Sequence, residues 1–170
     1  MIERRAAASL KQNGRTLFGY AARFGDPTSI GGWTEVIQPG AFSRSLAGPA
    51  AASIRAVYEH DSAALLGRVG AGTLRLTEDD VGLAFELDLP DTSLGRDLAE
   101  LVKRGDVSGC SFGFFPEKER WDGETRHLLD VDLQEVTITA TPAYPTTSVQ
   151  VRSKEPRTLR LARLYLECLR

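Results

Sequence analysis

Residues 107–115, Val-Ser-Gly-Cys-Ser-Phe-Gly-Phe-Phe, form a short apolar run of β type with a serine at its centre. Successive side chains of an extended chain point to opposite faces, so Phe112 and Phe114 share one face and Ser111 lies on the other, flanked by two glycines. The aromatic face predicts burial in a core, and the glycines leave room for another backbone to approach Ser111. The stretch therefore indicates a strand that displays a serine nucleophile, although serine and glycine in a strand are also typical of a bulge.

The overall composition is that of a soluble globular protein with one domain. The chain has 170 residues, with 42% hydrophobic and 26% charged residues, and this length is enough for one sizeable core. The net charge of -2 gives no electrostatic reason to expect a nucleic-acid partner. No apolar run approaches the ~18 residues of a membrane span, and no signal-peptide pattern follows the N-terminus. These features predict a cytoplasmic protein without a membrane partner.

The two cysteines, Cys110 and Cys168, lie far apart and lack the spacing of a metal site. They are interpreted as small buried apolar residues in a reducing compartment. No metal and no organic cofactor is implied by the sequence.

Short β-type runs separated by turn residues dominate the chain. Strands are expected at 15–24, 33–37, 54–59, 65–69, 72–77, 82–89, 107–115, 128–141 and 147–151. Helices are expected at 41–46 and, from a cap at Thr92-Ser93, up to Gly105, whereas 48–52 is expected to be a flexible connection and Asp122-Gly123 the turn of a charged hairpin. This order predicts a mainly β protein with helices (α+β), in which an antiparallel sheet closes, or nearly closes, into a barrel.

The last residues differ in character from the rest of the chain. After Pro156, apolar residues recur at 3-4-3 spacing with arginines mostly elsewhere on the helix surface, which predicts an amphipathic helix. We therefore divide the chain into a domain at 1–152 and a helical tail at 153–170. The tail helix is expected either to pack on its own domain or to bind an acidic partner.

A serine nucleophile requires a general base, and the chain has only two histidines. His60 follows an apolar strand at the start of a loop, and an unperturbed imidazole pKa of ~6.5 suits proton transfer near neutral pH. Glu135 lies in a β-rich apolar run, where a carboxylate needs a partner, so it is the best candidate to orient His60. Alternatives remain: His60 as a surface histidine, Glu135 as an edge residue facing water, and Asp61 or His127 as the third group.

Several ordered segments resemble the prohead proteases of tailed bacteriophages, which process capsid and scaffold proteins during head maturation. The matching pieces are Phe18-Gly19-Tyr20-Ala21 with Phe24, Ile37-Gln38-Pro39-Gly40-Ala41-Phe42, Glu59-His60-Asp61 with Leu66-Gly67, Asp91-Thr92, Gly109 to Phe114, and Glu135 to Ala143. Together they span most of residues 15–151. Residues 152–170 lie outside this match.

The resemblance implies a β-barrel like that of the herpesvirus assemblins, with His60 as general base and Ser111 as nucleophile. It supports Glu135 as third member less firmly, because assemblins pair their serine with two histidines, which keeps His127 as an alternative. It implies a serine endopeptidase that cleaves scaffold and major capsid proteins, and itself, inside the assembling prohead in the cytoplasm of a bacterial host. A homo-oligomer and an origin in a phage, a prophage or a gene-transfer particle all remain open.

The alternative from another functional class is a non-catalytic β-barrel component of a phage-like particle or of its assembly machinery. In that case Ser111 and His60 are ordinary structural residues. A non-protease esterase is disfavoured, because Ser111 lies in Gly109-Cys110-Ser111-Phe112-Gly113 without the strand-to-helix turn that would make this segment a nucleophile elbow.

Overall fold

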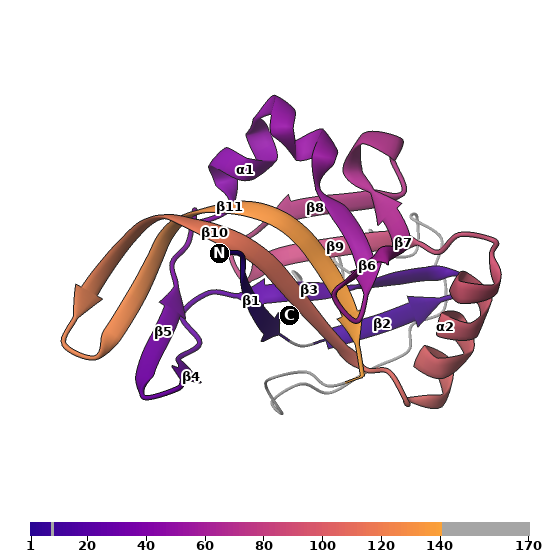
Figure 1. The fold of residues 1–170 in the computed structure, drawn as a ribbon, viewed down its shortest axis with the longest axis horizontal. Helices are drawn as coiled ribbons and strands as arrows, with labels where there is room; N and C mark the ends of the chain where they lie inside the picture. Colours follow the sequence, from indigo (N-terminus) through magenta and orange to yellow (C-terminus); the bar gives the residue numbers. More distant parts are fainter. Residues whose placement is uncertain (8, 141–170) are drawn as a thin grey trace, which may run out of the picture.

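The computed structural model describes residues 1–7 and 9–140, with only the backbone at positions 6, 7, 9, 11 and 12. Two β-sheets pack against each other, with helices at the periphery (Figure 1). The seven-stranded sheet contains β1 (Glu3–Ala7), β10 (Gly109–Asp122), β11 (Thr125–Thr139), β5 (Trp33–Ile37), β4 (Thr28–Ile30), β6 (Arg55–Tyr58) and β7 (Asp61–Arg68). The four-stranded sheet contains β2 (Ser9–Asn13), β3 (Thr16–Arg23), β9 (Gly82–Asp88) and β8 (Leu74–Glu78). The fold is therefore mainly β, as predicted from the sequence.

The predicted barrel closure is wrong. Within residues 1–7 and 9–140, β1 pairs only with β10, and β2 pairs only with β3, so no ladder of hydrogen bonds joins the two sheets. Within the described residues, the pairing of β1 with β10 extends to Ala7, and the pairing of β2 with β3 begins at Ser9. The two sheets instead enclose a shared apolar core, in which Phe42 and Phe112 meet edge to face and Phe112 stacks on Phe114.

The described part of the chain has four helical segments besides the strands: α1 (Ser43–Ala47), η1 (Pro49–Ser53), η2 (Val69–Ala71) and α2 (Ser93–Arg104). The predicted cap of α2 is present, because the Thr92 hydroxyl accepts a hydrogen bond from the Gly95 amide, and Gly105 ends the helix in a left-handed conformation. Leu98 and Val102 are buried beneath it. The flexible connection expected at 48–52 is largely the 3-10 helix η1, because Pro49 at its first position favours a helical start.

The long hairpin of β10 and β11 forms the arched strand pair at the front of Figure 1. Its two-residue loop is Gly123-Glu124, one position later than predicted, because Asp122 pairs with Thr125 and Gly123 has the positive φ. Along its other edge, β11 pairs in parallel first with β5 and later with β6. Between these two ladders, the Ser45 hydroxyl donates to the Val131 carbonyl and accepts from the Leu133 amide. The helix α1 thus satisfies the backbone of β11 where no strand covers it.

Some sequence predictions lie outside the described residues or were missed. The strand at 147–151, the tail helix, Cys168 and the boundary at 152 fall beyond residue 140. The strands β1, β2 and β4 were not predicted. No helix of the described part of the chain is long and apolar enough to cross a membrane.

Candidate active site

Ser111 lies in the first half of β10, directly opposite Thr137 of β11 and Ala6 of β1. The expected display of Ser111 at the surface is wrong, because Ser111 is only 2% exposed and all residues from Gly109 to Phe114 are buried. The strand β1 pairs with the edge of β10 along this segment. The Ser111 hydroxyl donates a 2.6 Å hydrogen bond to the carbonyl oxygen of Arg5 in that strand.

His60 lies in the two-residue turn between β6 and β7, where Tyr58 pairs with Asp61. Both turn residues, Glu59 and His60, have positive φ values, of 50° and 58°, which are costly for residues with a side chain. The Glu59 carboxylate stabilises this turn, since it accepts hydrogen bonds from the Thr139 hydroxyl at 2.9 Å and the Ala140 amide at 2.7 Å. The turn places the imidazole back over β11.

The imidazole of His60 lies against two buried side chains of β11. Its Nδ1 is 2.8 Å from the Glu135 carboxylate and 3.1 Å from the Thr137 hydroxyl. Glu135 is 2% exposed, whereas the His60 side chain is 24% exposed. With Nδ1–H donated to the carboxylate, Nε2 is left as the acceptor, which is the tautomer that a general base needs.

Gly113 makes room for this arrangement. It pairs with Glu135, and a Cβ atom at Gly113 would lie 2.8 Å from Glu135 Cγ, closer than carbon atoms approach. The Glu135 side chain therefore fills the space over Gly113. The backbone that approaches Ser111 is that of β1, whose Arg5 carbonyl accepts the serine hydroxyl. Arg4 of β1 also reaches this carboxylate, with Nε 3.5 Å from Oε1.

Asp61 and His127, the two alternatives to Glu135 as the third group, contact other residues. The Asp61 carboxylate is exposed and accepts a hydrogen bond from the Ala63 amide at 2.8 Å. His127, near the start of β11, has its Nδ1 3.1 Å from Gln38 Nε2. The structure thus brings His60 into contact with Glu135, which lies on the strand that pairs with β10. The side chains of Asp61 and His127 instead contact Ala63 and Gln38.

Sequence reasoning missed Thr137, Arg4 and Glu59 as neighbours of the site. Thr137 and Glu135 are two residues apart in one strand, so alternation alone places both side chains on one face. The contribution of β1 had no comparable signal, because its sequence, Glu-Arg-Arg-Ala-Ala, lacks the β-branched and aromatic residues typical of strands.

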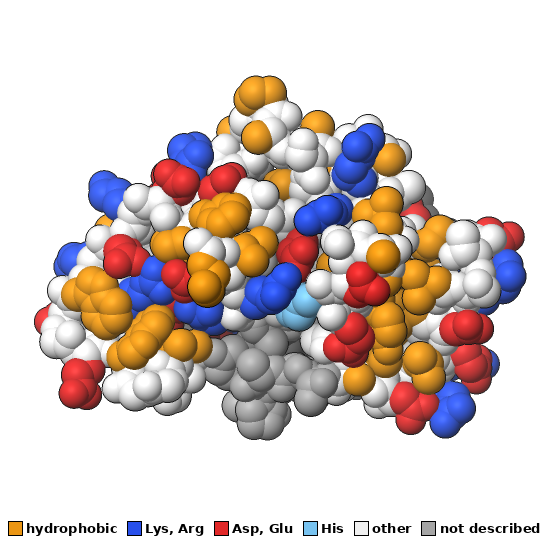
Figure 2. All heavy atoms as spheres, viewed as in Figure 1, with side chains coloured by type: hydrophobic (Ala, Val, Ile, Leu, Met, Phe, Trp, Pro, Cys, Tyr) orange, Lys and Arg blue, Asp and Glu red, His pale blue; other side chains and the backbone are white. Residues whose placement is uncertain are grey.

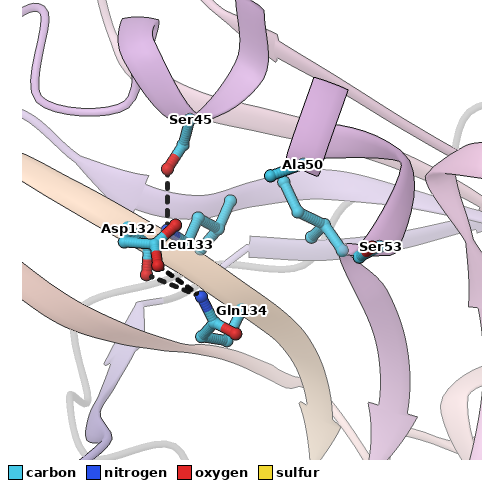
Figure 3. Close-up of a pocket in the computed structure, with 7 residues that line it drawn as sticks. Ser45, Ala50, Ser53, Asp132, Leu133 and Gln134 are labelled. Carbon is cyan, nitrogen blue, oxygen red and sulfur yellow. Dashed lines mark hydrogen bonds between the residues drawn. The ribbon is translucent and has the colours of Figure 1, made fainter. Parts of the chain in front are cut away.

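A separate pocket of about 270 Å³ lies between η1, α1 and β11 (Figure 3). The sticks in Figure 3 show the Ser45 hydroxyl pointing at the backbone of Leu133, and the Gln134 amide bonded to Asp132. None of the three candidate catalytic side chains lines this pocket. Within the described residues, no group of three or more His, Cys, Asp or Glu side chains is placed to hold a metal ion.

Comparison with models of known protein families assigns the chain to a family. The family model described as Caudovirus prohead serine protease matches residues 2–160. The chain belongs to the caudovirus prohead serine protease family. Comparison with curated proteins and with solved structures gives no match. This membership agrees with the resemblance of the ordered segments from Phe18 to Ala143. The matched range also includes the N-terminal strand β1.

Proposed function

We propose that this chain is a serine endopeptidase of phage head maturation in which Ser111 is the nucleophile, His60 the general base and Glu135 the group that orients His60. The observation that carries the proposal is the 2.8 Å contact of His60 Nδ1 with a carboxylate that is 2% exposed, on the strand next to Ser111. A buried carboxylate that faces an imidazole stabilises the cation which forms when the imidazole takes a proton.

The reaction is acyl transfer through a covalent intermediate. Ser111 Oγ attacks the carbonyl carbon of a peptide bond while His60 Nε2 takes the hydroxyl proton, giving a tetrahedral oxyanion. The oxyanion collapses, the C–N bond breaks and His60 returns the proton to the leaving amine. Water, deprotonated by His60, then attacks the ester, and Ser111 leaves with the proton. Before the first step, the Ser111 hydroxyl has to exchange the Arg5 carbonyl for His60.

The substrates we propose are the scaffold and major capsid polypeptides of the particle, and the protease chain itself. The family membership supports this class, since its members are described as prohead proteases. The proposed site of action is the assembling prohead in a bacterial host.

One observation favours the alternative of a non-catalytic particle component. The Ser111 hydroxyl is satisfied by a backbone carbonyl, as that of a structural serine would be. The two proposals differ in the consequence of removing the hydroxyl.

The deciding experiment is the intact mass of the cognate major capsid protein after co-expression with this chain. The wild type is expected to remove a defined segment, Ser111→Ala to leave the capsid protein whole, and the control Ser108→Ala to behave as wild type. Electron microscopy verifies that proheads have formed. A capsid protein of full mass in assembled proheads with the wild type would contradict the protease assignment.

A further inference from the structure

The edge of β10 beside Ser111 is occupied by the chain's own N-terminal strand. The strand β1 has five residues and runs antiparallel to β10, with Glu3 opposite Phe114 and Ala7 opposite Cys110. The ladder thus extends from Cys110 to Phe114 and includes Ser111. Because the main-chain hydrogen bonds of a sheet do not depend on sequence, another extended peptide can replace so short a strand at this edge.

Two contacts of β1 involve the candidate catalytic groups. The Arg5 carbonyl accepts the Ser111 hydroxyl at 2.6 Å, and Arg4 Nε lies 3.5 Å from the Glu135 carboxylate. The first contact directs the hydroxyl proton to a backbone oxygen that cannot act as a base. The second places a competing cation beside the carboxylate that holds His60. While β1 is in place, the site is assembled but its nucleophile is engaged.

Polar side chains, not apolar ones, fix the first half of β1. Arg5 forms an ion pair with Glu35 of β5, and its guanidinium lies 5.5 Å from the centre of the Phe114 ring and 6.0 Å from that of Trp33. Glu3 forms an ion pair with Arg126 of β11. At the left of Figure 2, over the end of the β10–β11 hairpin, apolar side chains lie beside a group of Lys or Arg side chains. Glu35, Phe114 and Trp33 therefore form a subsite that holds an arginine side chain.

We propose that the edge of β10 from Cys110 to Phe114 is the strand-binding site for the polypeptide substrate, and that β1 occupies it in the resting chain. An incoming extended segment replaces β1 and continues the sheet as an antiparallel strand. A basic residue of that segment enters the subsite of Glu35, Phe114 and Trp33 that Arg5 now fills. This inference rests on the proposed function, because it assigns the substrate site of the same serine.

A reducible disulfide between β1 and β10 tests the proposal. Ala7 is the register partner of Cys110, and directly paired residues of antiparallel strands have Cα atoms about 4.5–5.5 Å apart, within the range of a disulfide. The variant is Ala7→Cys in a Cys168→Ser background, oxidised and then reduced. The rate at which a fluorophosphonate labels Ser111 is followed by intact mass. We expect labelling to be at least tenfold slower in the oxidised form, and the control Ala7→Ser to be indifferent to reductant. Equal rates in the oxidised and reduced forms would overturn the proposal.

A second variant covers the case in which the disulfide does not form. Arg5→Ala loosens β1 without altering its backbone, and we expect about tenfold faster labelling of Ser111, whereas Arg96→Ala on the exposed face of α2 leaves the rate unchanged. A synthetic peptide of residues 2–7, in excess, is expected to slow the labelling of Arg5→Ala, and the same peptide with alanine in place of Arg5 to slow it less. Labelling of Arg5→Ala at the wild-type rate, or indifference to the peptide, contradicts the strand-binding site alone. Absence of labelling in every form would contradict the catalytic role of Ser111 as well.

Discussion

Two buried carboxylates on the large sheet, Glu135 and Glu35, differ in how their charges are balanced. Both side chains are 2% exposed. Glu35, at the end of the hairpin away from Ser111, is bonded to the guanidinium groups of Arg5 and Arg126. Glu135 is hydrogen-bonded to the imidazole of His60 and has one arginine, Arg4, at 3.5 Å.

The difference separates a structural carboxylate from one that is available for catalysis. The charge of a carboxylate held between two permanent cations is already compensated. Such a carboxylate can hold strands together, but it gives little further stabilisation to a positive charge that appears during a reaction. A carboxylate beside an imidazole is compensated most strongly when that imidazole becomes a cation. Burial is equal in the two cases, so the partner and not the burial distinguishes their roles.

The largest effect is expected for Glu135→Gln. The amide can still occupy the site, but it lacks the charge, and its NH2 group can face Nδ1 and select the wrong tautomer of His60. We expect kcat for capsid-protein or peptide cleavage to fall by roughly 10⁴ with little change in KM, as for loss of the carboxylate in a Ser-His-Asp triad. The matched control is Asp132→Asn, which removes a charge from the same strand. A kcat within threefold of the wild type would remove Glu135 from the mechanism.

The corresponding change at Glu35 is expected to act on stability. Glu35→Gln leaves Arg5 and Arg126 short of a partner in a buried site, at a cost of about 3 kcal/mol in the free energy of unfolding. The value lies at the low end of the usual range because Arg126 keeps Glu3 and Glu119. Urea unfolding measures the loss, and Glu86→Gln on the exposed face of β9 is the control. Because β1 is loosened, labelling of Ser111 should become faster, opposite in sign to Glu135→Gln.

The sequence predicted most strands and the helix α2 because their turn and cap residues are local. Gly105 ends the helix and Thr92 begins it through contacts within a few residues. The pairing of His60 with Glu135 was also predicted, since each residue type needed a partner and few candidates existed. The roles of these residues in catalysis stay predictions.

Closure of the sheets and the position of β1 could not be predicted for a shared reason. Both depend on which strand edges meet, and that is decided by contacts between residues far apart in the sequence, such as Arg5 with Glu35, 30 positions apart, and Glu3 with Arg126, 123 positions apart. The pattern Glu-Arg-Arg in residues 3–5 is typical of a solvated terminus when read alone. These charged residues are stabilised in a strand because they form ion pairs with Glu35 of β5 and Arg126 of β11.

Gly113→Ala tests whether the space around Glu135 is required. The new Cβ would meet Glu135 Cγ at 2.8 Å, so the carboxylate has to move away from His60. We expect a cost of about 1–3 kcal/mol in stability, typical of overpacking, and a lower kcat. The control is Gly48→Ala, where the nearest atom to the new Cβ is the Arg44 carbonyl oxygen at an ordinary 3.5 Å. Unchanged kcat in Gly113→Ala would show that Glu135 tolerates displacement and would weaken the contrast with Glu35.

The smallest effect is the response of β1 to acid. Burial by itself raises the pKa of Glu3, but the hydrogen bond and charge of Arg126, together with the charge of Arg5, outweigh it, so the pKa of Glu3 in the folded chain lies below 4.5. The stabilisation is therefore complete above pH 4.5 and is lost as the pH falls through the lower, folded value. We expect the difference in unfolding free energy between the wild type and Glu3→Gln to shrink over this window, and hydrogen exchange of the β1 amides to rise in the wild type. Asp91, just before α2, also has a lowered pKa, but its causes are Arg96 and Arg15 and not residues of β1, so Asp91→Asn serves as control. A difference that stays constant down to pH 3 would show that the Glu3 charge does not hold β1, leaving Arg5 and Glu35 as its ionic anchor.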